Sequence, residues 1–434
     1  MLPSNMKIKD IRALEVLDSR GNPTVAATVI LDSGVSATAM VPSGASTGSY
    51  EAVELRDQDA GRYHGQGVLT ALKNITDKIR PVLLGLDPTE QEKIDELMIR
   101  LDGTENKANL GANAILAVSL AVARAAAAGS GKPLYQYLTK FNPDFSGRYT
   151  MPIPMMNVLN GGKHANWATD IQEYMILPVG AENMAGAVRI GSEIYQSLKK
   201  IIKDHGYSVA VGDEGGFAPA VKNNEETFAL LAEAVKAAGY ELGRDIIFGI
   251  DAAASEFFKD GAYYLKKEGK NLSGYELAGF YRDLATRYPI YSFEDVFAED
   301  DWDSFRDFTA AGGDKIQVVG DDLYVTNVKR LERGIAEKTT NSILIKLNQI
   351  GTLSETIKAV LLARQKGLTA VISHRSGETE DAFIADLVVA MGSGQIKAGA
   401  PARSERTAKY NRLMAIEDEL KGLAFYATWP FAGK

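Results

Sequence analysis

The chain has 434 residues, of which 45% are hydrophobic and 24% charged, and this composition is typical of a folded globular protein. Its formal net charge of −8 leaves no broad basic surface for a nucleic-acid backbone, so a small anionic ligand would need local cations or metal ions. The absence of cysteine excludes disulfides, thiolate metal sites and cysteine nucleophiles, and it favours a reducing compartment. Because the N-terminal sequence MLPSNMKIKDI also lacks the apolar core of a secretory signal, we expect a cytoplasmic protein.

The first part of the chain changes from strand-like to helical periodicity. Residues 7–40 are rich in β-branched residues and include a glycine turn, which predicts strands. Apolar residues recur at helical spacing from residue 67 to residue 138. Strands followed by helices indicate a small α+β domain, which we predict to cover residues 1–142.

The stretch of this domain that most resembles a membrane span lies at residues 112–129. Asn113, Ser119 and Arg124 interrupt it, and most of its other residues are small. A membrane-spanning helix is therefore the weaker interpretation, and we predict a tightly packed buried helix.

A second domain, residues 143–434, is predicted to begin in a segment with three prolines at residues 142–156. Beyond it, short apolar runs that end in polar or charged residues alternate with amphipathic helices. The runs occupy residues 208–216, 246–253, 290–297, 315–323, 342–349, 369–377 and 394–400. This alternation predicts a largely parallel sheet. Because no Rossmann glycine fingerprint accompanies it, a closed β/α barrel is favoured over an open doubly wound sheet.

Nearly every predicted strand ends in an ionisable residue. In chain order these are Glu214, Asp251, Glu294, Asp321, Lys346, His374 and Lys397. One charged strand end is most often a solvated rim residue. A series of them at the same point of successive barrel strands would converge on one mouth, where the chemistry of such barrels takes place.

The residue types at this mouth predict a metal-assisted proton abstraction. Asp251, Glu294 and Asp321 would repel one another unless a cation neutralised them, and carboxylate oxygens favour Mg²⁺ over zinc or copper. Lys346 and Lys397 would face that ion, and a lysine beside a dication can lose its proton and act as a base. The predicted reaction is removal of a proton next to a carboxylate.

Six motifs along the whole chain resemble those of the enolase family. They are DSRGNPT (18–24), PSGASTG (42–48), GDEGGFAP (212–219), IKLNQIG (345–351), SHRSGETED (373–381) and GAPARSER (399–406). The resemblance implies an N-terminal α+β domain that caps an eight-stranded barrel whose opening differs from the ordinary (βα)₈ order. It also implies reversible dehydration of 2-phospho-D-glycerate to phosphoenolpyruvate, a step of glycolysis and gluconeogenesis. Enolase-type sites are themselves a standard example of a lysine or histidine base working with Mg²⁺.

The resemblance assigns roles to individual residues. Lys346 looks like the base that takes the C2 proton, and Glu214 like the acid that protonates the leaving C3 hydroxyl. Asp321 and Asp322 are adjacent, and the residues alone do not show which of them would bind a metal ion; the family pattern indicates Asp321. Ser46 looks like a ligand of a second Mg²⁺ that binds with substrate. The implied ligands of the first, tightly held Mg²⁺ are Asp251, Glu294 and Asp321.

The same resemblance implies the substrate pocket. Its residues are His164, Gln172, Glu173, His374, Arg375, Ser376 and Lys397. Arg375 and Ser376 look like phosphate ligands, a task that suits a fork-shaped guanidinium. Taken alone, His164 would more often be a surface residue, and the bulky Trp167 stands where small or polar residues are common. The alternatives are a superfamily relative that acts on another acid and a non-catalytic protein on the same fold.

The resemblance further implies a homodimer, or a higher oligomer, in which the N-terminal domain of one subunit meets the barrel of another. Leu14, Ala26 and Ala415 stand where the family commonly has arginine, glutamate and arginine. One ion pair has therefore lost both members, whereas Glu405 has lost its arginine. An unpaired buried charge can cost several kcal/mol, so we expect a weakened dimer. Exposed pairs would be worth only about 0–1 kcal/mol, and their loss would change little.

Overall fold

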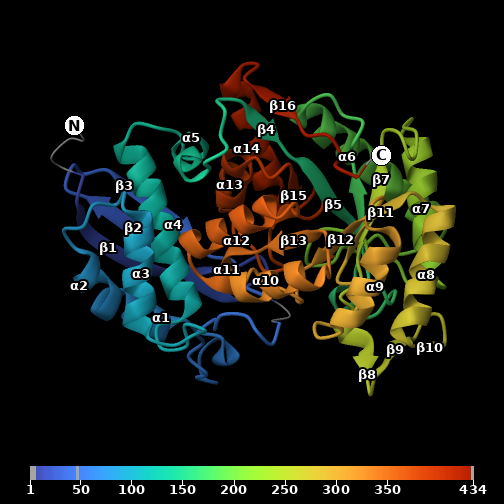
Figure 1. Ribbon diagram of the computed structural model, residues 1–434, viewed down its shortest axis with the longest axis horizontal. Helices are drawn as coiled ribbons and strands as arrows, with labels where there is room; N and C mark the ends of the chain where they lie inside the picture. Colours follow the sequence, from blue (N-terminus) through green and yellow to red (C-terminus); the bar gives the residue numbers. More distant parts are fainter. Residues whose placement is uncertain (1–5, 45–47, 432–434) are drawn as a thin grey trace.

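The computed structural model describes residues 6–44 and 48–431 and consists of an N-terminal α+β domain beside a β/α barrel (Figure 1). The predicted strands of the first domain are β1 (Ile8–Leu17), β2 (Pro23–Leu31) and β3 (Ser36–Met40), which form an antiparallel sheet in this order. Its helices are η1 (Tyr63–Gly65), α1 (Leu69–Asn74), η2 (Ile75–Ile79), α2 (Arg80–Leu83), α3 (Gln91–Asp102), α4 (Ala112–Gly129), α5 (Leu134–Leu138) and η3 (Thr139–Phe141).

Helix α4 is the core of the N-terminal domain. Among the described residues it is the one helix long and apolar enough to cross a membrane, but 83% of it is buried inside the protein. It packs on β2 and β3, where its many alanines favour the helical conformation and allow close contact with the sheet. The prediction of a buried helix is confirmed.

The barrel is closed and has eight strands in the order β11-β12-β13-β14-β15-β5-β6-β7. Their bounds are β5 (Ile153–Asn160), β6 (Glu173–Leu177), β7 (Ile247–Asp251), β11 (Ile290–Glu294), β12 (Gln317–Gly320), β13 (Ser342–Ile345), β14 (Thr369–Ser373) and β15 (Gln395–Lys397). Neighbouring strands are parallel except that β6 runs antiparallel to both β5 and β7. The fold class that we predicted, including the unusual opening of the barrel, is confirmed.

Helices surround the barrel, and short strands lie outside it. The helices are η4 (Gly162–Ala165), α6 (Met184–Asp204), α7 (Asn224–Ala237), η5 (Ala254–Phe257), α8 (Gly274–Arg287), α9 (Trp302–Gly312), α10 (Val328–Glu337), α11 (Leu347–Ile350), α12 (Leu353–Gln365), α13 (Phe383–Met391) and α14 (Ser404–Leu420). The strands β8 (Phe258–Lys259), β9 (Ala262–Leu265) and β10 (Lys270–Leu272) form a small antiparallel sheet, and β4 (Tyr149–Met151) pairs with β16 (Ala424–Tyr426).

One predicted strand differs in the structure. Residues 208–216 are not a barrel strand, because their glycines turn the chain back on itself, with Gly212 N–H donating to Gly216 O at 2.8 Å. This loop lies against the end of β5, and Phe217 N–H donates to Val158 O at 2.9 Å. Residues 142–156, where we predicted the second domain to begin, contain β4 and the beginning of β5.

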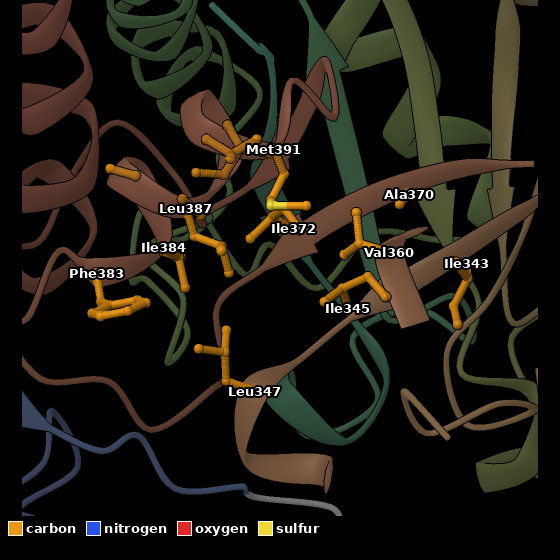
Figure 2. Packing of buried hydrophobic residues seen from close by; sticks show 14 of the residues in the cluster. Ile343, Ile345, Leu347, Val360, Ala370, Ile372, Phe383, Ile384, Leu387 and Met391 are labelled. Carbon is orange, nitrogen blue, oxygen red and sulfur yellow. The ribbon is translucent and has the colours of Figure 1, made fainter. Parts of the chain in front are cut away.

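The strands alternate between two apolar cores. On β13, Ile343 and Ile345 pack outward against the helices, whereas Leu344 belongs to a separate cluster inside the barrel. On the neighbouring β14, Ile372 points outward and Val371 inward. Figure 2 shows the outer layer, in which side chains of β13 and β14 meet those of α12 and α13. This two-residue period fixes the register of the strands and therefore the positions of their carboxyl ends.

Candidate active site

The carboxyl ends of the barrel strands surround a cavity of about 40 Å³, which is room for a few water molecules. Glu294 is fully buried behind the lining of this cavity and contacts Lys397. Ser46 lies outside the described residues, as does the side chain of His164, a residue of η4. The other predicted site residues line the cavity; they are Gln172, Glu173, Glu214, Asp251, Asp321, Lys346, His374, Arg375, Ser376 and Lys397.

Three carboxylates stand side by side on neighbouring strands. In the register of the sheet, Asp251 of β7 pairs with Glu294 of β11 on one side and with Glu173 of β6 on the other. Asp251 and Glu294 are the last residues of their strands, as predicted. Glu173 reaches the same mouth because β6 is antiparallel, which places its first residue there.

Lys397, the last residue of β15, offsets part of the negative charge of this row of carboxylates. Its Nζ lies 2.8 Å from Glu294 Oε1, 3.0 Å from Asp251 Oδ2 and 3.2 Å from Glu173 Oε2. Burial by itself lowers the pKa of Lys397, but the carboxylates, Asp251 first, outweigh burial and raise the pKa well above its usual value. Lys397 therefore supplies a fixed positive charge at the mouth.

The donor set of this row fits a divalent cation. Glu294 Oε2 is buried and has no hydrogen-bond partner among the described residues. Burial raises the pKa of Glu294 well above its usual value, and the charges of Asp251 and Asp321 add to this effect. A buried carboxylate oxygen without a donor, close to two further carboxylates, is a position that a hard dication would satisfy. The residues present therefore fit the predicted Mg²⁺.

Asp295 is a site residue that the sequence analysis missed. With Asp321 and Asp322 it forms a group whose oxygens lie within 4.8 Å of one another, and this group shares only Asp321 with the predicted ligands. The two oxygens of Asp295 accept the backbone N–H groups of Asp321 and Asp322, both at 2.8 Å, and so fix the turn after β12. Burial, followed by the charge of Asp321, raises the pKa of Asp322 to about 8. The acidic pair Glu294–Asp295 was the available signal in the sequence.

Lys346 follows β13 and forms an ion pair with Asp321. Gln349 Nε2 donates to the other oxygen of Asp321 at 2.8 Å, and the Thr326 hydroxyl bridges Gln349 Oε1 and the backbone N–H of Lys346, each at 2.9 Å. Burial by itself lowers the pKa of Lys346, but Asp321 outweighs burial and raises it above its usual value. A lowered pKa, which we expected for a base, therefore requires that a cation takes up the charge of Asp321.

Arg375, one of the predicted phosphate ligands, is held by the N-terminal domain. Its guanidinium donates to both oxygens of Glu51, at 2.9 and 3.2 Å, and to Asn348 Oδ1 at 3.1 Å. The structure thus adds Glu51 to the site. Nothing in the sequence signalled this residue, because the pairing joins positions 324 residues apart. A phosphate group at Arg375 would share the guanidinium with Glu51.

The predicted acid, Glu214, reaches the mouth from the loop that follows α6 rather than from a strand. Asn157 Nδ2 donates to Glu214 Oε2 at 3.0 Å, and His374 Nε2 lies 3.4 Å from the same oxygen. Burial lowers the pKa of His374 to about 3. A neutral histidine and the carboxyl group of Glu214 are thus brought together on the side of the cavity formed by β5 and β14.

The fold is a β/α barrel whose second strand is reversed, and its mouth holds buried carboxylates and lysines. This combination is typical of a barrel enzyme with an acidic metal centre. The family model of the enolase C-terminal TIM barrel domain matches residues 148–433, and that of the enolase N-terminal domain matches residues 8–138. The chain therefore belongs to the enolase family. It is a lyase-type enzyme of the enolase superfamily, whose members bind Mg²⁺.

Proposed function

We propose that the protein catalyses the reversible dehydration of 2-phospho-D-glycerate to phosphoenolpyruvate. The observation that supports this best is the single small cavity lined by a lysine, a carboxylic acid and an arginine–serine pair, namely Lys346, Glu214, Arg375 and Ser376. These groups match the proton, the hydroxyl and the phosphate of this substrate. We place the activity in the cytoplasm, within glycolysis and gluconeogenesis, and the absence of cysteine supports a reducing compartment.

In this proposal Lys346 and Glu214 divide the chemistry between them. Lys346 Nζ accepts the C2 proton of the substrate, and the Glu214 carboxyl gives a proton to the C3 hydroxyl, which leaves as water. The two groups need opposite protonation states at one pH, so their surroundings must separate their pKa values. Gln172, Glu173, His164 and His374 complete the pocket around them.

The negative charge of the intermediate needs fixed positive charge nearby, which is usually the largest contribution to catalysis. Lys397 supplies one such charge from the protein. Two Mg²⁺ ions, when bound, would neutralise the substrate carboxylate as charge develops on it. We propose Asp251, Glu294 and Asp321 as the residues that hold the first ion and Ser46 as a ligand of the second.

The test of this function is formation of phosphoenolpyruvate from 2-phosphoglycerate, followed by its ultraviolet absorbance with and without chelator. We expect turnover with Mg²⁺ and none with an excess of chelator. A superfamily relative that acts on another acid would leave 2-phosphoglycerate unchanged but would exchange the α-proton of its own substrate. A non-catalytic protein on this fold would do neither, and either result would contradict the proposal.

We also propose that the protein is a homodimer held largely by apolar contacts. Leu14 and Leu17 of β1 are 64% and 54% exposed. Glu405 does not lack a partner, contrary to our expectation from the sequence, because Arg403 Nε of the same chain donates to it at 2.8 Å. Glu405 is therefore not an unpaired charge that would weaken the proposed contact.

Analytical ultracentrifugation over a dilution series checks this assembly. We expect a dimer at micromolar concentration whose dissociation depends little on salt, because apolar contacts are not screened. A dimer that stays intact at low nanomolar concentration and loosens strongly with salt would contradict it. A chain that is monomeric at every concentration would do so as well.

A further inference from the structure

Arg406, near the start of α14, is a fully buried arginine whose two terminal nitrogens donate to two loops of the site. Its Nη1 donates to His374 Nδ1 and to Arg375 O, both at 2.6 Å. Its Nη2 donates to Ser376 O at 2.6 Å and to Asp213 O at 3.0 Å. One planar group thus ties the run that carries the predicted phosphate ligands to the loop that carries Glu214.

The backbone leaves room for this guanidinium at Gly399. This residue has φ +82°, and a Cβ atom there would lie 2.8 Å from Arg406 Cδ and 2.8 Å from the carbonyl oxygen of Glu214. Ala400 N–H donates to that same carbonyl at 3.0 Å. The chain before α14 is therefore shaped so that Arg406 and the Glu214 loop pack against each other.

The contact with His374 fixes which ring nitrogen carries the proton. A guanidinium has five N–H donors and no acceptor, so His374 Nδ1 must accept from Arg406. The proton of the neutral ring is then on Nε2, which lies 3.4 Å from Glu214 Oε2. Oε2 also accepts from Asn157 Nδ2 at 3.0 Å.

We propose that Arg406 is a positioning residue for the acid half of the reaction, holding the Nε2–H tautomer of His374 against Glu214 and fixing the loop of Glu214 in place. This inference rests on the proposed dehydration of 2-phosphoglycerate. Among the described residues Arg406 forms no hydrogen bond with Lys346 or with the row of carboxylates, so we expect the base half of the reaction to depend on it less than the acid half.

The experiment compares Arg406→Lys with Arg412→Lys. Arg412 is a second arginine of α14, whose guanidinium donates to both oxygens of Asp386, at 3.0 and 2.8 Å, outside the cavity. In Arg406→Lys a single ammonium cannot span both loops. We therefore expect dehydration at saturating substrate to fall about 100-fold, as for a misplaced catalytic group, while exchange of the C2 proton with solvent deuterium changes less than about threefold. Arg412→Lys should change neither rate beyond about threefold.

The other possible results of this comparison would overturn either the positioning role of Arg406 or the proposed function. Equal losses of dehydration and C2 exchange in Arg406→Lys would overturn the positioning role, and so would unchanged dehydration. The same selective loss in Arg412→Lys would also overturn it, because the effect would belong to α14 as a whole. Failure of the proposed function would look different, since the wild-type enzyme would then neither dehydrate 2-phosphoglycerate nor exchange its C2 proton.

A second measurement determines the tautomer of His374 in the wild-type protein and uses a variant only to assign its signals. The chain has four histidines, so ¹⁵N labelling of histidine and comparison with His374→Asn assigns the signals of His374 in the wild-type protein. We expect a protonated Nε2 and an unprotonated, hydrogen-bonded Nδ1 across the neutral pH range. A protonated Nδ1, in either the other tautomer or the imidazolium, would overturn the inference.

Discussion

Replacing Lys346 by alanine is expected to abolish both dehydration of 2-phosphoglycerate and exchange of its C2 proton with solvent deuterium. Replacing Glu214 by glutamine is expected to abolish dehydration and to leave C2 exchange measurable, because Glu214 acts only on the leaving hydroxyl. General acid–base groups contribute about 10²–10⁴-fold, so each lost rate should fall by at least about 100-fold. Proton NMR in deuterium oxide measures exchange, and ultraviolet absorbance measures dehydration.

Lys107→Ala is a suitable control for the lysine variant. Lys107 is also a buried lysine paired with a carboxylate, 3.1 Å from Glu355, but it does not line the cavity. We expect this variant to lose stability and to keep both activities. Retention of C2 exchange in Lys346→Ala together with its loss in Glu214→Gln would mean that the roles of acid and base are reversed.

Removing the divalent cation is expected to abolish activity, and adding Mg²⁺ should restore it. Glu294→Gln should weaken this binding, because it removes a charge and one of the oxygens that lie without a donor at the mouth. A ligand at about 100 times its dissociation constant stabilises a protein by about 2.7 kcal/mol, so Mg²⁺ should raise the melting temperature of the wild type clearly. That increment should shrink in Glu294→Gln. Titrations followed by thermal unfolding and by turnover measure both effects.

Asp386→Asn provides the matched carboxylate control. Asp386 is buried and paired with Arg412, away from the cavity, so its replacement should leave the Mg²⁺-dependent increment in melting temperature unchanged. Undiminished turnover in a demonstrably metal-free preparation would contradict the whole assignment of the metal site. An equal increment in Glu294→Gln and the wild type would remove Glu294 from the set of ligands.

The sequence predicted the barrel where strands alternate with helices and missed it where they do not. The barrel strands β7 and β11 to β15 appear in the sequence as apolar runs that end in polar or charged residues, and these runs predicted their positions. The hairpin of β5 and β6 has only the short 3-10 helix η4 between its strands and no amphipathic α-helix, so it lacks the signal on which the prediction depended. Glu214 was assigned correctly to the mouth but wrongly to a strand, because Val211 and Phe217 pair only in an isolated bridge.

The site shows a similar limit. Residues at strand ends were predictable, because the topology of a barrel brings those ends together whatever the details of packing. Glu51, Asp295 and Arg406 were not assigned to the site. Glu51 belongs to the other domain. Asp295 follows the predicted residue Glu294, and Arg406 is the last residue of the motif GAPARSER, yet neither position revealed a role in the site. Their roles depend on which side chains meet in the folded interior, and no periodicity of the chain encodes that.

The reversed direction of β6 has a consequence for how such a site can change. A segment that connects a barrel strand to a helix is tied to the barrel wall at one end only, and its other end moves with the outer helix. Residues 161–172, by contrast, leave β5 at the mouth and enter β6 at the mouth, so both ends are anchored to hydrogen-bonded neighbours of the wall. Lengthening or exchanging this segment, which contains η4, would reshape the entrance without shifting a barrel strand or an outer helix. It is thus a self-contained module, on which evolution or an engineer could alter the size of the accepted acid while the acid–base machinery stays in place.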